Sequence, residues 1–263
     1  KVTTQDLTHR LSIDNLPQEL GELAHGFNVM LDRLDAGVQQ LSQFSDDLAH
    51  EMRAPLTNLM GKAQVTLSRQ RPPEEYKAVL ESNTEELERL ARIVSDMLFL
   101  AQVSHPAARG SFTQVSLAEE AHRVMDLFAL SAEDKQLTLT LSGDAQVQGD
   151  RLMIQRALSN LLSNAIRHSP AQSHISMLVE AYGNQVALSV SNPGPGIEAQ
   201  HLPHLFERFY RVDSSRARTE GGTGLGLAIV QSIMALHQGQ ADVRSLPGGF
   251  TLFRLVFPRV LPE

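Results

Sequence analysis

The chain has no cysteine among its 263 residues. This absence excludes a disulfide framework, a thiolate metal site and a cysteine nucleophile, and it is compatible with a reducing compartment, so we expect the cytoplasm. Basic residues are also scarce, because 23 lysines and arginines stand against 30 acidic residues and give a formal net charge of −7. Nucleic-acid binding needs a concentrated basic face, so we set nucleic acid aside as a partner.

A long hydrophobic run is missing as well. Nowhere do roughly 18 uninterrupted apolar residues occur, the length that predicts a membrane span. The sequence starts at Lys1, inside a helical pattern and without a basic and apolar leader. We therefore expect a soluble piece of a longer protein whose upstream part is anchored in a membrane.

An apolar repeat with spacings of four and three occupies the start of the chain and is typical of a coiled-coil seam. Its members are Leu16, Leu20, Leu23, Phe27, Met30, Leu34, Val38, Leu41 and Leu48. Two successive spacings of four, between Met30 and Val38, form a stutter that locally unwinds a supercoil and is a place where rotation could be passed along. A plain helical spacer is the alternative interpretation.

A second repeat alternates four and three throughout. It consists of Tyr76, Leu80, Asn83, Leu87, Leu90, Val94, Met97 and Ala101. The proline-marked stretch SRQRPPEE precedes it, so residues 41–103 are predicted to form an antiparallel helical hairpin. Because so thin a hairpin cannot bury its own seam, we expect a homodimer in which two hairpins close a four-helix bundle.

One histidine, His50, stands in the first helix of this hairpin, within DLAHEMRAPL. At about 100° per residue the opposite side of the helix is apolar, so His50 is expected to face solvent. That opposite side comprises Leu48, Met52, Pro55, Leu59 and Ala63, whereas Arg53, Ala54, Thr57 and Gly61 share the face of His50. Glu51 could orient the imidazole and accept its proton, and Pro55 removes a hydrogen bond to the Glu51 carbonyl. By position alone, an ordinary surface histidine is the alternative.

After the linker SHPAARGS the pattern changes to alternating strands. These are LTLTLSG, ISMLVEA, QVALSVSN and FTLFRLVF. Gly183 and Asn184 predict a hairpin turn between the second and third of them. Helical segments fall between and around the strands, so we expect a separate α/β domain over residues 112–263, with a mixed sheet covered on one face by helices.

Polar side chains gather on one side of a helix predicted over DRLMIQRALSNLLSNAIRHS. Asn160, Asn164, Arg167 and His168 fall within about a quarter turn, while the other side carries Ile154, Leu158, Leu161, Leu162 and Ala165. Amide oxygens with water can hold Mg²⁺ and a guanidinium suits phosphate, so a magnesium nucleotide is a natural ligand. A solvated helix face is the alternative.

Two glycine-containing stretches follow, NPGPGI at 192–197 and GGTGLGLAIV at 221–230. Glycines let backbone N–H groups approach phosphates closely, and the N-terminus of the helix after the second stretch favours negative charge. The second stretch is not a P-loop, because no Gly-Lys-Ser/Thr follows, and its helix is not the first crossover of a dinucleotide-binding unit.

In this order, HEMRAPL, NLLSNAIRHS, NPGPGI, LFERFYR and GGTGLGLAIV resemble the H, N, G1, F and G2 boxes of bacterial sensor histidine kinases. DLTHRLSIDNLPQELGELAHGFNVMLDRL resembles the second half of a HAMP linker, the relay between a transmembrane helix and the kinase. FSDDLAHEMRAPLTNL and IVSDMLFLAQ are similar to the heavy-metal (copper or silver) sensor branch. The resemblance implies the cytoplasmic portion of a bacterial inner-membrane protein.

Four parts of the chain follow from the resemblance. Residues 1–40 would be the HAMP second half and signalling helix, residues 41–105 the dimerisation and histidine phosphotransfer hairpin, and residues 106–111 a linker. Residues 112–263 would be the catalytic domain, an α/β sandwich of the histidine kinase, gyrase and chaperone type. The implied fold class is a dimeric four-helix bundle with a coiled-coil lead-in, followed by this ATP-binding domain.

The resemblance also implies a role for each matching residue. His50 would be the phosphoacceptor and Glu51 its general base, with ATP and Mg²⁺ as cofactors and a response-regulator aspartate as the final acceptor. Asn160 and Asn164 would bind Mg²⁺. The residues implied to hold the nucleotide are Asn160, Asn164, Arg167, His168, Asn192, Gly194, Gly196, Arg208, Arg211, Gly222, Thr223, Gly224, Leu225 and Gly226. Residues 197–221 would be a mobile lid.

Two positions depart from the family pattern. Asn192 stands where the family has an aspartate that reads the adenine amino group, and its amide oxygen can accept the same hydrogen bond without the negative charge, so we expect weaker nucleotide binding. Ala54 stands where the family often has Thr or Asn to position a hydrolytic water, so we expect weak or absent phosphatase activity.

His201 and His204 could supply half of a metal site, but Pro203 lies between them and no clear third ligand is evident, so we expect them to be lid residues. Any metal sensing would lie outside this chain. Two other functions stay open from the sequence: a related ATPase of the gyrase and chaperone type without a phosphorylated histidine, and a non-catalytic dimeric signalling scaffold.

Overall fold

The computed structural model describes residues 9–11, 17–103, 112–212 and 222–259. The chain divides into two compact units, Lys1–Leu90 and Ala91–Glu263. The expected linker at 106–111 and most of residues 1–16 of the HAMP-like stretch lie outside the described residues. Within the described ranges, no helix is both long and apolar enough to cross a membrane.

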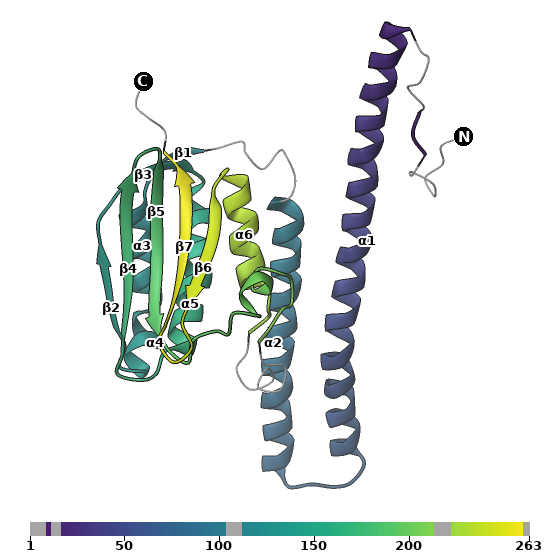
Figure 1. The fold of residues 1–263 in the computed structure, drawn as a ribbon. Coiled ribbons are helices and arrows are strands. Elements are labelled where there is room, and N and C mark those ends of the chain that lie inside the picture. The colour runs from purple at the N-terminus through teal and green to yellow at the C-terminus, as the bar shows by residue number, and fades with distance from the viewer. Residues whose placement is uncertain (1–8, 12–16, 104–111, 213–221, 260–263) are drawn as a thin grey trace. The chain divides into compact units, whose positions relative to one another are not determined.

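A helical hairpin dominates the first unit. Helix α1 spans Gln18–Leu67 and helix α2 spans Pro73–Val103, with α2 passing into the second unit at Ala91 (Figure 1). Near the turn, the Lys62 ammonium donates to the Ser82 hydroxyl at 2.8 Å. Helix α1 continues through Pro55. In the helical turn around this proline, the Thr57 hydroxyl donates to the Arg53 carbonyl at 2.8 Å. The predicted hairpin and its proline-marked turn are confirmed.

Much of the predicted apolar seam stays exposed in the single chain. The exposed members are Leu20, Leu23, Phe27, Met30, Leu34 and Val38 in α1 and Leu80 and Leu87 in α2. A short preceding segment is tied to α1, because Arg10 pairs with Asp32 at 2.6 Å and the Asn28 amide exchanges two hydrogen bonds with the Leu11 backbone. The single hairpin therefore leaves a long apolar stripe without cover.

The second unit contains a five-stranded mixed sheet in the order β2-β4-β5-β7-β6. Its strands are β2 (Thr138–Ser142), β4 (His174–Tyr182), β5 (Gln185–Pro193), β6 (Gln240–Ser245) and β7 (Phe250–Pro258). Strands β2 and β4 are parallel and the other pairs are antiparallel, with β4 and β5 joined at Gly183, whose φ is +55°. The predicted mixed sheet and hairpin are confirmed.

Helices cover one face of this sheet (Figure 1). Besides the end of α2, the described residues of this unit form the helices α3 (Leu117–Leu127), α4 (Ala129–Asp134), α5 (Arg151–His168), the 3₁₀ turn η2 (Leu202–His204) and α6 (Gly226–Leu236). The side of α5 that the sequence predicts to be apolar is buried, with Leu158, Leu161 and Leu162 fully inaccessible. Strand β6 and the two-stranded sheet of β1 (Thr113–Ser116) and β3 (Gln146–Gly149) are additions that the sequence analysis did not predict.

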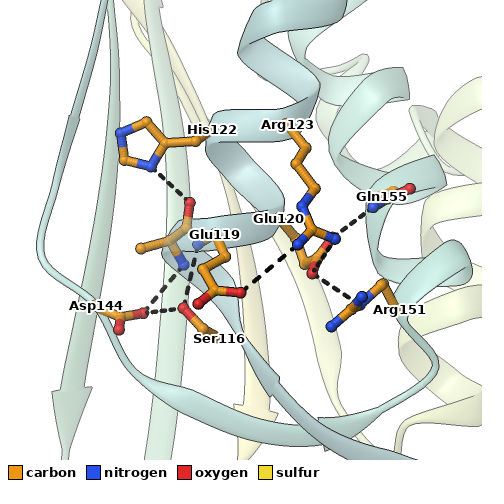
Figure 2. A network of polar contacts seen from close by, with 9 residues as sticks. Ser116, Glu119, Glu120, His122, Arg123, Asp144, Arg151 and Gln155 are labelled. Atoms are coloured by element: carbon orange, nitrogen blue, oxygen red, sulfur yellow. Dashed lines mark hydrogen bonds and ion pairs between the residues drawn. The ribbon is translucent and has the colours of Figure 1, made fainter.

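A buried carboxylate joins α3 to the first turn of α5 (Figure 2). Glu120 is fully buried on α3, and its Oε1 lies 3.0 Å from Arg151 Nε and 3.4 Å from Arg123 Nη1. The Gln155 amide donates to the other carboxylate oxygen. A buried charge is costly unless it is paired, so these contacts fix the start of α5 against α3.

A buried histidine supports the same end of α5. The Asp150 side chain caps α5 by accepting from Met153 N–H at 3.0 Å, and Asp150 N–H donates to His237 Nε2 at 3.0 Å. His237 Nδ1 donates to the Ile233 carbonyl at 2.7 Å, so the ring is neutral with its proton on Nδ1. Burial lowers the pKa of His237 below its ordinary value of 6.5.

Replacing Glu120 by alanine should lower the free energy of unfolding by about 1–3 kcal/mol, because the buried carboxylate loses its hydrogen bond from Gln155 and its charge-assisted contacts with Arg123 and Arg151. Glu119→Ala is the matched control: its carboxylate is 65% exposed and also approaches Arg123, so a change below about 1 kcal/mol is expected. Calorimetric unfolding of the full chain measures both. Equal losses in the two variants would contradict a structural role for Glu120.

The neutral His237 ring predicts acid sensitivity. The folded unit binds a proton at this ring less readily than the unfolded chain does, so the free energy of unfolding is unaffected above pH 6.5 and falls as the pH drops below it. His237→Gln should flatten the dependence of the melting temperature on pH below 6.5, whereas the exposed His122→Gln should keep it. An unchanged slope in His237→Gln would refute this assignment.

Candidate functional site

The polar side of α5 faces the loop before α6. Asn160 and Asn164 are half-buried on this side, and Asn160 Nδ2 is buried without a hydrogen-bond partner in the part of the chain that the structure describes. A Cβ atom at Gly226 would stand 3.2 Å from Asn160 Oδ1. The absence of a side chain at Gly226 therefore lets the start of α6 approach Asn160 closely. The Asn160 amide nitrogen at this point can donate a hydrogen bond to a ligand.

Two arginines converge on the same loop. Arg211 Nη1 donates to the Gly222 carbonyl at 2.7 Å, and a Cβ atom at Gly222 would collide with the Arg167 guanidinium. Helix α6 begins at Gly226 without a side-chain cap, so its first backbone N–H groups are available to a ligand. Cationic side chains and a helix N-terminus together make this loop suited to phosphate.

Thr223 connects the loop to a carboxylate that the sequence analysis did not single out. Its hydroxyl accepts from Leu225 N–H at 3.3 Å and donates to Asp96 Oδ2 at 3.2 Å. Asp96 lies on the part of α2 that belongs to the second unit. No local pattern marks such a contact, because it joins positions 127 residues apart.

The loop NPGPGI lies at the C-terminal end of α5. Asn192 is buried, and its Nδ2 donates to the Pro193 carbonyl at 2.9 Å, which leaves Oδ1 as a free acceptor site on this amide. A Cβ atom at Gly194 would come within 2.9 Å of the His168 carbonyl oxygen. Gly196 has a φ of +72° and is packed against the Leu246 backbone, so both glycines are required by close approach.

The stretch LFERFYR places Phe209 beside the second glycine loop. Phe209 has a φ of +61°, an uncommon conformation for an aromatic residue, and its N–H donates to the Gly224 carbonyl at 2.9 Å. Gly224 itself has a φ of +73° and leaves no space for a Cβ atom against the Phe209 backbone. Arg208 is half-buried, and the expected lid continues into residues 213–221, which lie outside the described residues.

His201 and His204 lie around Tyr210 without a shared third ligand. His201 Nδ1 is 2.7 Å from the Tyr210 hydroxyl, and His204 Nδ1 is 2.7 Å from Glu207 Oε1. No group of three or more His, Cys, Asp or Glu side chains within residues 9–11, 17–103, 112–212 and 222–259 is arranged to hold a metal ion.

A lysine that the sequence analysis missed caps the far end of α5. Lys135 Nζ donates to the carbonyls of Ile166 and Arg167, each at 2.9 Å. A cation at a helix C-terminus satisfies carbonyls that lack partners within the helix and complements the helix dipole. Lys135 thus fixes the turn that carries Arg167 and His168.

The phosphoacceptor candidate belongs to the first unit. His50 is exposed on α1, as predicted, and Glu51 beside it is half-buried. The predicted apolar side is confirmed, since Pro55 is buried and Leu48, Met52 and Leu59 are half-buried. In the second unit the structure brings together Asn160, Arg167, His168, Gly194, Gly222 and Gly226, whereas His50 and Glu51 belong to the first unit.

Three known domain families match the chain in sequence. Residues 1–36 match the HAMP domain, residues 40–106 the His Kinase A (phospho-acceptor) domain, and residues 149–261 the family of histidine kinase-, DNA gyrase B- and HSP90-like ATPases. The third match contains every residue that the structure gathers at the polar side of α5.

Several curated proteins are similar over nearly the whole chain. Sensor protein IrlS of Burkholderia pseudomallei is 47% identical over 240 residues, which cover 91% of this chain and 52% of IrlS. Sensor histidine kinase CusS of Escherichia coli K12 is 45% identical and sensor protein CzcS of Cupriavidus metallidurans 40% identical, each over 98% of this chain and 54% of the relative. The chain thus spans about half the length of the curated relatives it matches.

Solved structures share the fold. Histidine kinase ThkA in complex with the response regulator protein TrrA matches with a TM-score of 0.67 and 25% identity, over 86% of this chain and 64% of that chain. Full-length ShkA in complex with AMPPNP matches with a TM-score of 0.62 and 25% identity, over 84% of this chain and 46% of that chain.

Proposed function

Because the chain belongs to the sensor histidine kinases and carries their HAMP, phospho-acceptor and ATPase domains in order, we propose that it phosphorylates His50 from Mg-ATP. The phosphoryl group then passes to an aspartate on the receiver domain of a response regulator. The complex of the related ThkA with a response regulator supports this choice of partner. The chain is the catalytic part of a two-component sensor.

The observation that carries the proposal is the convergence around α5. Among the described residues, an amide donor without a partner at Asn160, two arginines at Gly222 and an uncapped helix start at Gly226 meet in one place. These groups fit a magnesium nucleotide, since the amide, guanidinium and backbone N–H groups suit phosphate oxygens, and the oxygens of the same asparagine amides, with water, suit Mg²⁺.

Each group then has a distinct task. Asn160 and Asn164 hold Mg²⁺, which neutralises phosphate charge when it is bound. Arg167, His168, Arg208 and Arg211 face the phosphates together with residues 222–226. Asn192 accepts a hydrogen bond from the adenine amino group through Oδ1, which its bond to the Pro193 carbonyl leaves available, and Gly194 and Gly196 let the loop backbone approach the base.

The transfer itself is a displacement at the terminal phosphorus of ATP. A ring nitrogen of His50 forms the new P–N bond, the bond from phosphorus to the ADP oxygen breaks, and Glu51 takes the imidazole proton. An exposed imidazole is required for this step, because the nucleotide is held by a different unit of the chain. The same exposure allows a receiver domain to reach the phosphorylated ring.

A second copy of the chain covers the apolar stripe of the hairpin. The exposed leucines of α1 and α2 have the spacing of a coiled-coil seam, and exposing them to water is unfavourable. Two hairpins packed through this stripe make an antiparallel four-helix bundle. The homodimer is therefore part of the proposed function.

Signal input lies upstream of this chain. The HAMP match at residues 1–36 supports a whole protein that is anchored in the bacterial inner membrane, with this chain on its cytoplasmic side. The similarity of residues 44–59 and 93–102 to the heavy-metal sensor branch supports a role in metal-responsive control of transcription. The metal would be sensed by a segment outside this chain.

The full chain incubated with Mg-ATP that is radioactive at the γ position should acquire acid-labile label at His50. His50→Gln should retain nucleotide binding and lose the label, because the nucleotide residues lie in the other unit. His25→Gln is the matched control, an exposed histidine of the same helix, and should be labelled like the wild type.

Two other outcomes identify the alternative functions. Hydrolysis of ATP without retained label would indicate an ATPase that uses no phosphohistidine. Absence of both label and equilibrium nucleotide binding would indicate a non-catalytic scaffold. Either result overturns the proposed kinase activity.

A further inference from the structure

The end of α2 is tied to the nucleotide-binding residues of its own unit by one carboxylate. Asp96 Oδ1 accepts from Arg156 Nη2 on α5 at 2.8 Å, and Asp96 Oδ2 accepts from the Thr223 hydroxyl at 3.2 Å. The Asp96 side chain is only 21% exposed, so these charge-assisted hydrogen bonds are weakly screened by water.

Arg156 completes the connection. Its guanidinium carbon lies 3.9 Å from the centre of the Phe99 ring, a cation–π distance, so Asp96 and Phe99 of α2 hold the same arginine. Arg156 precedes Asn160 by four residues on α5 and therefore lies one turn away on the same side of the helix. The contact thus reaches both the loop at Thr223 and the helix that carries Asn160.

The charge of Asp96 conflicts with the ligand proposed for this loop. The groups around Gly222 are the cations Arg167 and Arg211, and the start of α6 carries partial positive charge. Asp96 brings a negative charge to Thr223 in the middle of them. A hydroxyl has one proton to donate, so Thr223 cannot donate to Asp96 and to a phosphate oxygen at the same time.

We propose that Asp96 is a nucleotide-sensitive latch: the carboxylate and the nucleotide phosphates compete for Thr223, so the Asp96 contact and Mg-ATP binding oppose each other. This inference rests on the proposed nucleotide site. Mg-ATP binding breaks the Asp96–Thr223 hydrogen bond and so loosens the end of α2, which keeps its contacts with Arg156. Because coupling between two binding events is reciprocal, a rearrangement of α2 that breaks the contact raises the affinity for Mg-ATP. Asp96 is a regulatory residue and takes no part in the phosphoryl transfer.

Equilibrium titration of the full chain with Mg-ATP tests the competition. Asp96→Asn and Asp96→Ala should bind Mg-ATP roughly five- to tenfold more tightly than the wild type, the size of a modest allosteric coupling. Asp126→Asn is the matched control, because it removes one negative charge from an exposed position of the same unit, and its affinity should equal that of the wild type.

Amide hydrogen exchange gives a second readout that does not depend on a variant. In the wild type, residues 92–100 should exchange faster when Mg-ATP is bound, and in Asp96→Ala they should exchange at that faster rate without nucleotide. Unchanged or weaker Mg-ATP binding in both Asp96 variants, with normal binding in the wild type, would overturn the latch alone. A wild-type chain that binds no Mg-ATP would overturn the proposed function and the latch with it.

Discussion

The burial of one side of α5 is the constraint on which the catalytic unit depends. Leu158, Leu161 and Leu162 are fully inaccessible, so this helix cannot rotate about its axis without exposing its apolar side chains. With the rotation fixed, the opposite side carries Asn160 and Arg167 toward the loops at Gly226 and Gly222. Packing against the sheet thereby determines where the polar groups can meet a nucleotide.

Contacts at both ends of α5 fix its position along the axis. Asp150, held by His237, caps the first turn, and Glu120 ties that turn to α3. Lys135 caps the last turn. Catalysis of phosphoryl transfer depends mainly on positioning and charge neutralisation, so a helix that is fixed at both ends is a suitable support for Mg²⁺ and phosphate ligands. The Asp96 contact differs from these supports, because it joins α5 to α2, the second helix of the hairpin.

Periodicity made part of this architecture predictable. The helical hairpin, α5 and the hairpin of β4 and β5 follow from regular apolar spacing and a glycine turn, which are local properties of the chain. Strands β1 and β3 escaped prediction because four residues give too little alternation to recognise, and β6, with the sequence QADVRS, has a weak apolar pattern. In the single chain, α2 buries Ile93 and Leu100 in addition to Leu90 and Met97 of the predicted repeat. When one helix carries two adjacent apolar stripes, residue spacing alone does not show which stripe packs against the rest of the chain.

Asp96, Glu120 and Lys135 have partners more than 25 residues away along the chain, and no local sequence pattern marks such contacts.

Calorimetric titration with ATP in the presence and absence of Mg²⁺ tests the central claim most directly, with Asn160→Ala compared with Ser159→Ala, a change at the neighbouring half-buried position. If the polar side of α5 holds a magnesium nucleotide, the wild type and Ser159→Ala bind ATP in a Mg²⁺-dependent way, and Asn160→Ala loses at least about tenfold in affinity, as expected when a buried polar partner is removed. Equal binding by all three proteins, or binding that does not depend on Mg²⁺, would contradict the account.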